Sequence, residues 1–199
     1  MKNEQVTELL YQALETEMGG QQIYRAAIEC AQEPELKEEW QKYLDETTNH
    51  ERVLRETFEK IGLDPEVETP GRKVVRHKGE ALVAAMKMAM AEAGGAAAQL
   101  VAAESVVEAE TKDHQNWELI GRIAEASSGK MKSALQEAYE QVEEEEDEHL
   151  YHTMGWAREL WIKTLGMPAV IPPPEEEKKV KTAIGASRAE QSREEMLKA

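Results

Sequence analysis

EEEEDEH, from Glu143 to His149, is the stretch of this sequence that decides the fold. Apolar residues at helical spacing lie on both sides of it, and their stripe passes straight through the acidic run. The stripe consists of Leu135, Val142, Leu150, Met154 and Trp156. One or two of the carboxylates, together with His149, must therefore point where the core points. Because an unpaired buried charge is very costly, such groups usually pair with each other or coordinate a metal ion.

Composition limits the class of protein. The 199 residues are enough for one sizeable domain, and the residues that dominate are those that favour helices. The net charge of −16 argues against nucleic acid or an anionic membrane as a partner and is compatible with attraction of cations. Cys30 is the only cysteine, which excludes an intrachain disulfide and a cysteine-rich zinc or iron site.

Neither a signal peptide nor a membrane span is expected. The first ten residues lack the order of a basic region followed by an apolar one. The most apolar region, residues 81–107, is interrupted by Lys87, Glu92 and Glu104, so it does not resemble a transmembrane helix. We therefore expect a soluble, cytoplasmic protein.

Hydrophobic periodicity predicts an all-α protein with four long helices. These are expected at residues 3–31, 35–61, 96–126 and 130–165. The segment that joins the second helix to the third is expected to be irregular over residues 63–75 and to carry a short extra helix over residues 79–93. Two antiparallel hairpins joined by such a crossover form a four-helix bundle. We assign residues 1–166 to this domain and residues 167–199 to a proline-interrupted charged tail, either a docking arm or disordered.

The two hairpins repeat each other loosely. YLDETTNH, residues 43–50, aligns with VEEEEDEH, residues 142–149, and each has a glutamate four residues before its histidine. Glu17 on the first helix, and Glu110 with Asp113 on the third, lie at mid-length on inward-facing stripes. Bundles that hold two iron or manganese ions use this kind of set, with a Glu from two helices and a Glu plus a His from the other two.

The position of the ligand relative to the histidine remains open. The usual spacing is Glu-x-x-His, which the fourth helix has with Glu146, whereas the second helix has Thr47 at the equivalent place. If Thr47 marks the ligand position, one bridging carboxylate is missing and one metal ion binds better than two. If Glu46 and Glu145 take that role, the site is complete, and the internal symmetry favours this reading. The candidate metal ligands are Glu17, Glu46, His50, Glu110, Asp113, Glu145, Glu146 and His149.

Five segments carry a family resemblance. They are LLYQALETEMGGQQIYRA, EPELKEEWQKYLDETTNHERVL, GEALVAAM, VVEAETKDHQNWELIGRIAEA and YEQVEEEEDEHL, which together span about Glu8 to Leu160. They resemble the ferritin-like superfamily, most closely the YciF-type bacterial ferritin-like stress proteins. The resemblance implies a ferritin-like four-helix bundle with a role in iron or oxidative-stress handling. The metal ligands that it implies are Glu17, Glu46, Glu110, Asp113 and Glu145, with His50 and His149 at positions that the family keeps polar.

Two functional hypotheses follow. In the first, each chain holds two Fe ions (or Mn) that react with dioxygen or peroxide, as in a di-iron oxidoreductase of the ferroxidase or peroxidase type, without catalytic residues beyond the metal ligands. In the second, the protein is a non-catalytic stress or structural protein whose bundle mediates dimerisation or partner binding, and metal only stabilises it. We expect a homodimer. A storage cage is disfavoured by Pro168 and the prolines at 172–174, which stand where a short fifth helix would follow the bundle.

Overall fold

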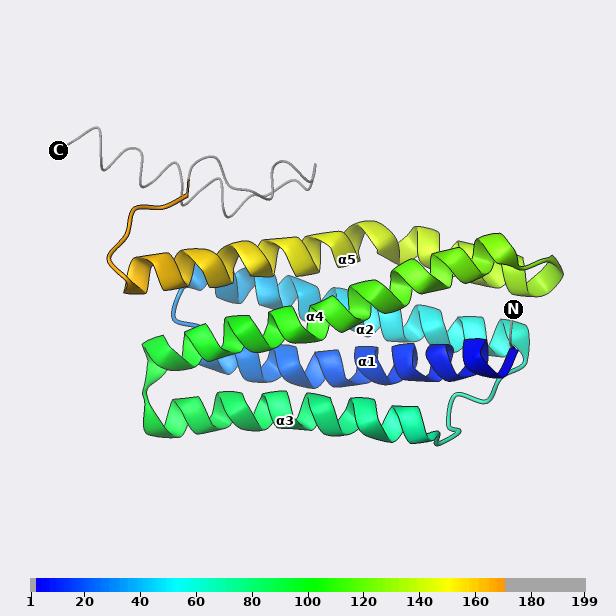
Figure 1. The fold of residues 1–199 in the computed structure, drawn as a ribbon, viewed down its shortest axis with the longest axis horizontal. Helices are drawn as coiled ribbons and strands as arrows, with labels where there is room; N and C mark the ends of the chain where they lie inside the picture. The colour runs from blue at the N-terminus through cyan, green and yellow to red at the C-terminus, as the bar shows by residue number, and fades with distance from the viewer. Residues whose placement is uncertain (1–2, 171–199) are drawn as a thin grey trace.

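The chain forms five α-helices within residues 3–170, the part that the computed structural model describes (Figure 1). They are α1 (Asn3–Cys30), α2 (Pro34–Ile61), α3 (Pro70–Glu92), α4 (Gly95–Ala126) and α5 (Gly129–Thr164). No strand occurs in this part of the chain. The prediction of an all-α protein is confirmed, and no helix in the described range is both long and apolar enough to cross a membrane.

Local sequence signals explain where the helices begin and end. Pro34 lies in the first turn of α2, where its missing N–H group costs nothing. Gly62 closes α2 with a positive φ of 80°, a conformation that glycine adopts without strain. Gly94 precedes α4 as its N-cap residue, and its positive φ of 82° lets the chain turn between α3 and α4. The predicted bounds of the four long helices are therefore accurate to within one residue.

The crossover differs from the prediction, because α3 begins at Pro70 rather than near residue 79. Thr69 caps its first turn, and the Thr69 side chain accepts a hydrogen bond of 3.1 Å from the Arg72 backbone N–H. The charged residues that follow gave no clear apolar stripe, so periodicity alone missed this part of the helix.

A buried ion pair holds this first part of α3 in place. The Arg72 Nε donates to Glu15 Oε2 on α1 at 2.9 Å, and both side chains are almost fully buried. Arg76 donates to the same carboxylate at 2.7 Å. A long-range contact, rather than helical amphipathicity, thus positions the charged half of α3.

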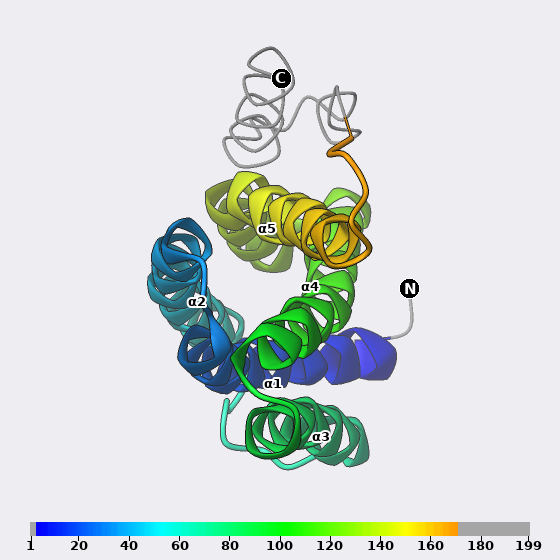
Figure 2. The same cartoon turned by 90° about the vertical axis from the view of Figure 1, so that its left-hand side faces the viewer.

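The four long helices make the bundle, and α3 lies outside it. The hairpin of α1 and α2 packs against the hairpin of α4 and α5, through α1 with α4 and α2 with α5. In the end view, α3 lies on the outer side of α1, away from α5 (Figure 2). Of the tail predicted at 167–199, residues from 171 onward lie outside the described range.

Two hydrophobic clusters fill the bundle and leave a polar level between them. One contains Tyr24, Trp40, Tyr43 and Trp156. The other contains Leu14, Leu54, Trp117 and Val142, among others. In each of the four long helices the residues between these clusters include buried glutamate, aspartate or histidine side chains. Apolar residues therefore lie on both sides of a polar centre along the bundle axis.

Candidate metal centre

Six ionisable side chains from four helices meet at this level, and each is at most 4% exposed. They are Glu17 on α1, His50 on α2, Glu110 and Asp113 on α4, and Glu146 and His149 on α5. Groups of this kind are almost never fully buried unless they are paired or coordinate a metal ion.

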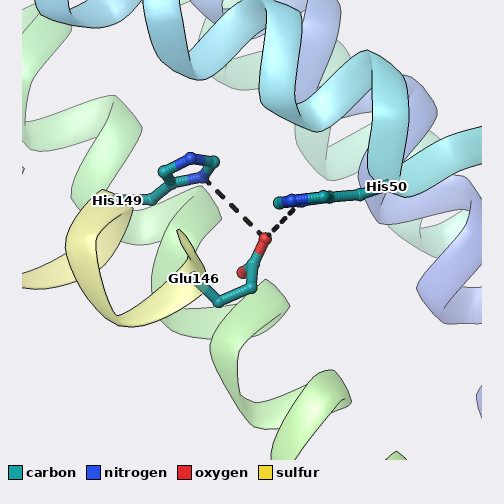
Figure 3. Close-up of side chains that lie close together, drawn as sticks. All are labelled: His50, Glu146 and His149. Carbon is teal, nitrogen blue, oxygen red and sulfur yellow. Dashed lines mark ion pairs between the residues drawn. The ribbon is translucent and has the colours of Figure 1, made fainter. Parts of the chain in front are cut away.

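Glu146 lies between the two histidines (Figure 3). Its Oε1 is 2.9 Å from His50 Nδ1 and 3.8 Å from His149 Nδ1. The two imidazole rings are stacked with centroids 5.5 Å apart and an interplanar angle of 24°. Both Nδ1 atoms thus face the same carboxylate from opposite hairpins.

Each histidine also faces the glutamate of the other helix in its own hairpin. His50 Nδ1 is 3.8 Å from Glu17 Oε1, and His149 Nδ1 is 3.8 Å from Glu110 Oε2. The loose repeat seen in the sequence therefore becomes an approximate structural symmetry of the centre.

The outer nitrogen of each imidazole pairs with a carboxylate of the opposite hairpin. His50 Nε2 is 2.7 Å from Glu145 Oε2, and His149 Nε2 is 3.0 Å from Glu46 Oε2. A carboxylate in this position accepts a hydrogen bond from Nε2–H and leaves the Nδ1 lone pair directed inward, as in carboxylate–histidine–metal arrangements. Burial, and the nearby charge of His50, lower the pKa of His149 well below its usual range, which favours this neutral form.

The side-chain atoms that could bind a metal ion form two adjacent groups. One oxygen atom from each of Glu17, Asp113 and Glu146 lies within 4.8 Å of the other two, as do donor atoms of His50, Glu146 and His149. Trp117 Nε1 donates a 2.7 Å hydrogen bond to Glu17 Oε1, which fixes the orientation of that carboxylate. Glu146 belongs to both groups.

Several buried oxygen and nitrogen atoms of these side chains make no hydrogen bond with any described residue. They are Glu17 Oε2, His50 Nδ1, Glu110 Oε2, Asp113 Oδ1, both oxygens of Glu146 and His149 Nδ1. His50 Nδ1 and Glu146 Oε1 are close enough for an ion pair but are not aligned for a hydrogen bond. Each unsatisfied buried group costs about 1–3 kcal/mol, so a cluster of them in one place fits a shared ligand. Oxygen and imidazole donors suit iron, manganese and similar divalent ions.

The electrostatics favour a cation. Burial first, and then the neighbouring carboxylates, raise the pKa values of Glu17, Asp113 and Glu146 well above their usual range. Burial also raises the pKa of Glu110 to about 7. Without a metal ion these groups keep their protons to higher pH than ordinary carboxyl groups do, and a bound cation would take the place of those protons.

The sequence favoured Glu145, with Glu46 as its counterpart, and the structure arranges these residues differently. Glu146 is buried at the centre, whereas the Glu145 side chain is 37% exposed and contacts the outer nitrogen of His50. Glu46 has the equivalent outer position beside His149. Thr47, at 2% exposure, stands where the symmetry of the hairpins would put a second Glu146.

Asp113 supplies the carboxylate that is missing at Thr47. It lies one helical turn after Glu110 and joins the group of Glu17 and Glu146. The centre therefore has four buried carboxylates and two imidazoles, the numbers used in dinuclear bundles, but with two carboxylates from α4 and none from α2.

The fold and these side chains define a class, the helical bundles with a buried cluster of carboxylates and histidines that could hold a metal ion. The family comparison is more specific: a family model described as Rubrerythrin matches residues 8–127. The chain belongs to the rubrerythrin family, within the ferritin-like superfamily. The matched range includes Glu17, His50, Glu110 and Asp113 and ends before α5. No curated protein and no solved structure matched the chain.

Two contacts of the centre were not predicted from the sequence. The sequence patterns assigned no polar contact to Trp117, but its indole N–H donates a hydrogen bond to Glu17. Next to the centre, the Tyr43 ring lies 4.3 Å from that of His149, and the Tyr43 hydroxyl donates to Glu39 at 2.6 Å. The spacing of four residues between Glu39 and Tyr43 is the signal that could have suggested this pair.

Proposed function

We propose that the buried centre binds two metal ions, iron or manganese, and that the protein acts on dioxygen or peroxide. The observation that carries this proposal is the set of unsatisfied donor atoms on Glu17, His50, Glu110, Asp113, Glu146 and His149. Membership of the rubrerythrin family supports it independently, because rubrerythrin-type domains bind iron.

The symmetry of the centre suggests how the ligands divide. Glu17 and His50 would hold one ion from the first hairpin, and Glu110 and His149 the other from the second. Glu146, which belongs to both groups of donors, would be shared, and Asp113 would complete the set beside Glu17. When bound, such ions supply redox chemistry and Lewis acidity.

The protein's own contribution is positioning, exclusion of water and control of protons. The two hydrophobic clusters close the bundle above and below the centre. Glu46 and Glu145 hold the imidazoles with their Nδ1 atoms inward. The carboxyl groups with raised pKa values give up their protons as cations bind, so loading the centre releases protons.

The test is to load metal-free protein anaerobically with Fe(II), remove unbound metal, and measure the metal content of each chain. Oxygen or hydrogen peroxide is then added, and the near-ultraviolet absorbance of oxidised iron is recorded. We expect two ions per chain and a rise in absorbance faster than that of free Fe(II). The variant Glu17→Gln should lose metal, whereas Glu80→Gln, an exposed change on α3, should not. Less than one ion per chain, without an absorbance change, would contradict the proposal.

The segments that resemble YciF-type stress proteins support a finer role in iron or oxidative-stress handling. We further propose that the protein acts in the cytoplasm as a homodimer, which native mass measurement and fractionation of the source cells would test.

Thr47 favours a second function, in which the bundle is a binding or structural protein stabilised by one metal ion. One ion per chain without oxidation of Fe(II), together with a Glu17→Gln variant that keeps the biological phenotype, would select this alternative.

A further inference from the structure

A small pocket on the α4–α5 hairpin is lined both by surface residues and by Glu146, a residue of the centre. Its volume is about 110 Å³. The residues that line it are His114, Trp117, Glu118, Tyr139, Glu143, Glu146 and Asp147. Trp117 and Glu146 are at most 1% exposed, whereas the other lining residues are exposed or half-buried. Glu146 and Trp117 therefore form the inner end of the pocket.

Glu146, at the buried end of the lining, has carboxylate oxygens without hydrogen-bond partners among the described residues. Glu146 Oε2 is buried and makes no hydrogen bond or ion pair with any described residue, although Glu146 lines the pocket. The pocket thus ends at the residue that belongs to both groups of donors. Since one water molecule occupies about 30 Å³, the pocket has room for a cation that keeps a few of its waters.

The mouth of this pocket is acidic. Glu118 and Glu143 are exposed, and Asp147 is half-buried with its Oδ1 2.7 Å from His114 Nε2. None of the residues that line the pocket, all of them in the described range, is a lysine or an arginine. A cleft lined by charges of one sign raises the local concentration of counter-ions and speeds their association.

The opposite seam, between α2 and α5, is less suited to cations. There Glu46 and Glu145 approach the outer nitrogens of the histidines, but Lys42 crosses the same seam. Its Nζ is 3.3 Å from Glu46 and 2.9 Å from Glu148. A positive charge at that position opposes the approach of a divalent cation.

We propose that the α4–α5 pocket is the path by which divalent cations reach the centre, with Glu143 and Asp147 holding the ion transiently before Glu146 takes it up. This inference rests on the proposed function, because it assumes a metal-binding centre. It adds a set of residues that control the rate of loading and are not themselves ligands of the final site.

The experiment compares metal-loading rates of the full chain and a variant with three changes, Glu118→Gln, Glu143→Gln and Asp147→Asn. Co²⁺ alone is the probe, and stopped-flow quenching of tryptophan fluorescence reports binding, since Trp117 contacts Glu17. A matched control carries Glu38→Gln, Glu80→Gln and Glu92→Gln, three exposed carboxylates on α2 and α3. It removes the same charge from other parts of the surface. Circular dichroism and thermal unfolding establish that both variants fold.

At low ionic strength we expect the pocket variant to bind Co²⁺ about tenfold more slowly than the parent and the control, with the difference shrinking as salt is added. Because a path affects both directions, release to a chelator should slow by a similar factor, and the number of ions bound should not change. Rates within twofold of the control, with binding intact, would overturn the inference. Failure of the parent protein to bind Co²⁺ would overturn the proposed function instead.

Discussion

The sharpest prediction concerns the neighbouring residues Glu145 and Glu146. Glu146 is 1% exposed and contributes to both groups of buried donors, whereas Glu145 makes one contact, at 2.7 Å, with the outer nitrogen of His50. We expect Glu146→Gln to abolish metal binding and Glu145→Gln only to weaken it. Both changes preserve size and remove one carboxylate, so each is the matched control of the other.

The size of the expected Tm shifts follows from the linkage between metal binding and folding. A ligand at 100 times its Kd stabilises the folded state by about 2.7 kcal/mol, which raises the Tm of a domain of this size by roughly 5–10 °C. Loss of a residue that orients a ligand weakens affinity about 10–100-fold. Glu145→Gln should then keep about 0.4–1.4 kcal/mol of the stabilisation at the same metal concentration, and recover the rest when more metal is added. Glu146→Gln should keep almost none at either concentration.

Without metal, we expect the Glu146→Gln variant to be at least as stable as the parent protein. Burial raises the pKa of Glu146, so the folded state pays a cost when this carboxyl ionises. Replacing it with neutral glutamine removes that cost, and the metal-free Tm at pH 8 should rise or stay the same.

Differential scanning calorimetry of metal-free protein, with and without Co²⁺, measures all these shifts. A Glu146→Gln protein that retains the full metal-induced shift, beside a Glu145→Gln protein that has lost it, would refute the assignment of Glu146 to the centre.

Three further predictions follow from the structure. The Tm of the metal-free protein should fall as the pH rises from about 4.5 to about 7, because Glu110, whose pKa burial raises from 4.5 to about 7, keeps its proton in the folded state and loses it in the unfolded state over this range. A calorimetric series in which the Tm rises through this window would contradict it. Trp117→Phe should weaken metal binding about tenfold in a chelator competition, because it removes the 2.7 Å hydrogen bond that orients Glu17. An unchanged Kd would show that this hydrogen bond is dispensable. Arg72→Met should lower the free energy of unfolding by about 3–5 kcal/mol in urea titrations, because it leaves buried Glu15 with one partner fewer. A loss below ~1 kcal/mol would mean that the Arg72–Glu15 ion pair does not keep the first part of α3 against α1.

The sequence predicted the bundle well because the information needed for it is local. The apolar stripes repeat with the period of a helix, and residues such as Pro34, Gly62 and Gly94 mark its ends. The early part of α3 was missed because its stability depends on Arg72 reaching Glu15, which is 57 residues away in the chain. A contact of that kind leaves no periodic signal.

The candidate centre was predicted in part for the same reason. Periodicity placed Glu17, Glu110, Asp113 and the two histidines on inward faces, and these side chains meet in the structure. It gave no means of seeing that Trp117 binds Glu17, since an aromatic residue on an apolar stripe looks the same whether or not its N–H has a partner.

The stretch from Glu143 to His149 divides what the sequence determined from what it left open. The sequence by itself determined that an acidic run crosses the core face of a helix and that a histidine follows on the same face. Only the tertiary structure decided that Glu146 faces the centre and Glu145 faces its outer edge. Adjacent residues in a helix differ by about 100° in direction, so both lie near the border of the apolar stripe. The rotation of α5 about its own axis selects between them, and packing against α2 and α4 sets that rotation.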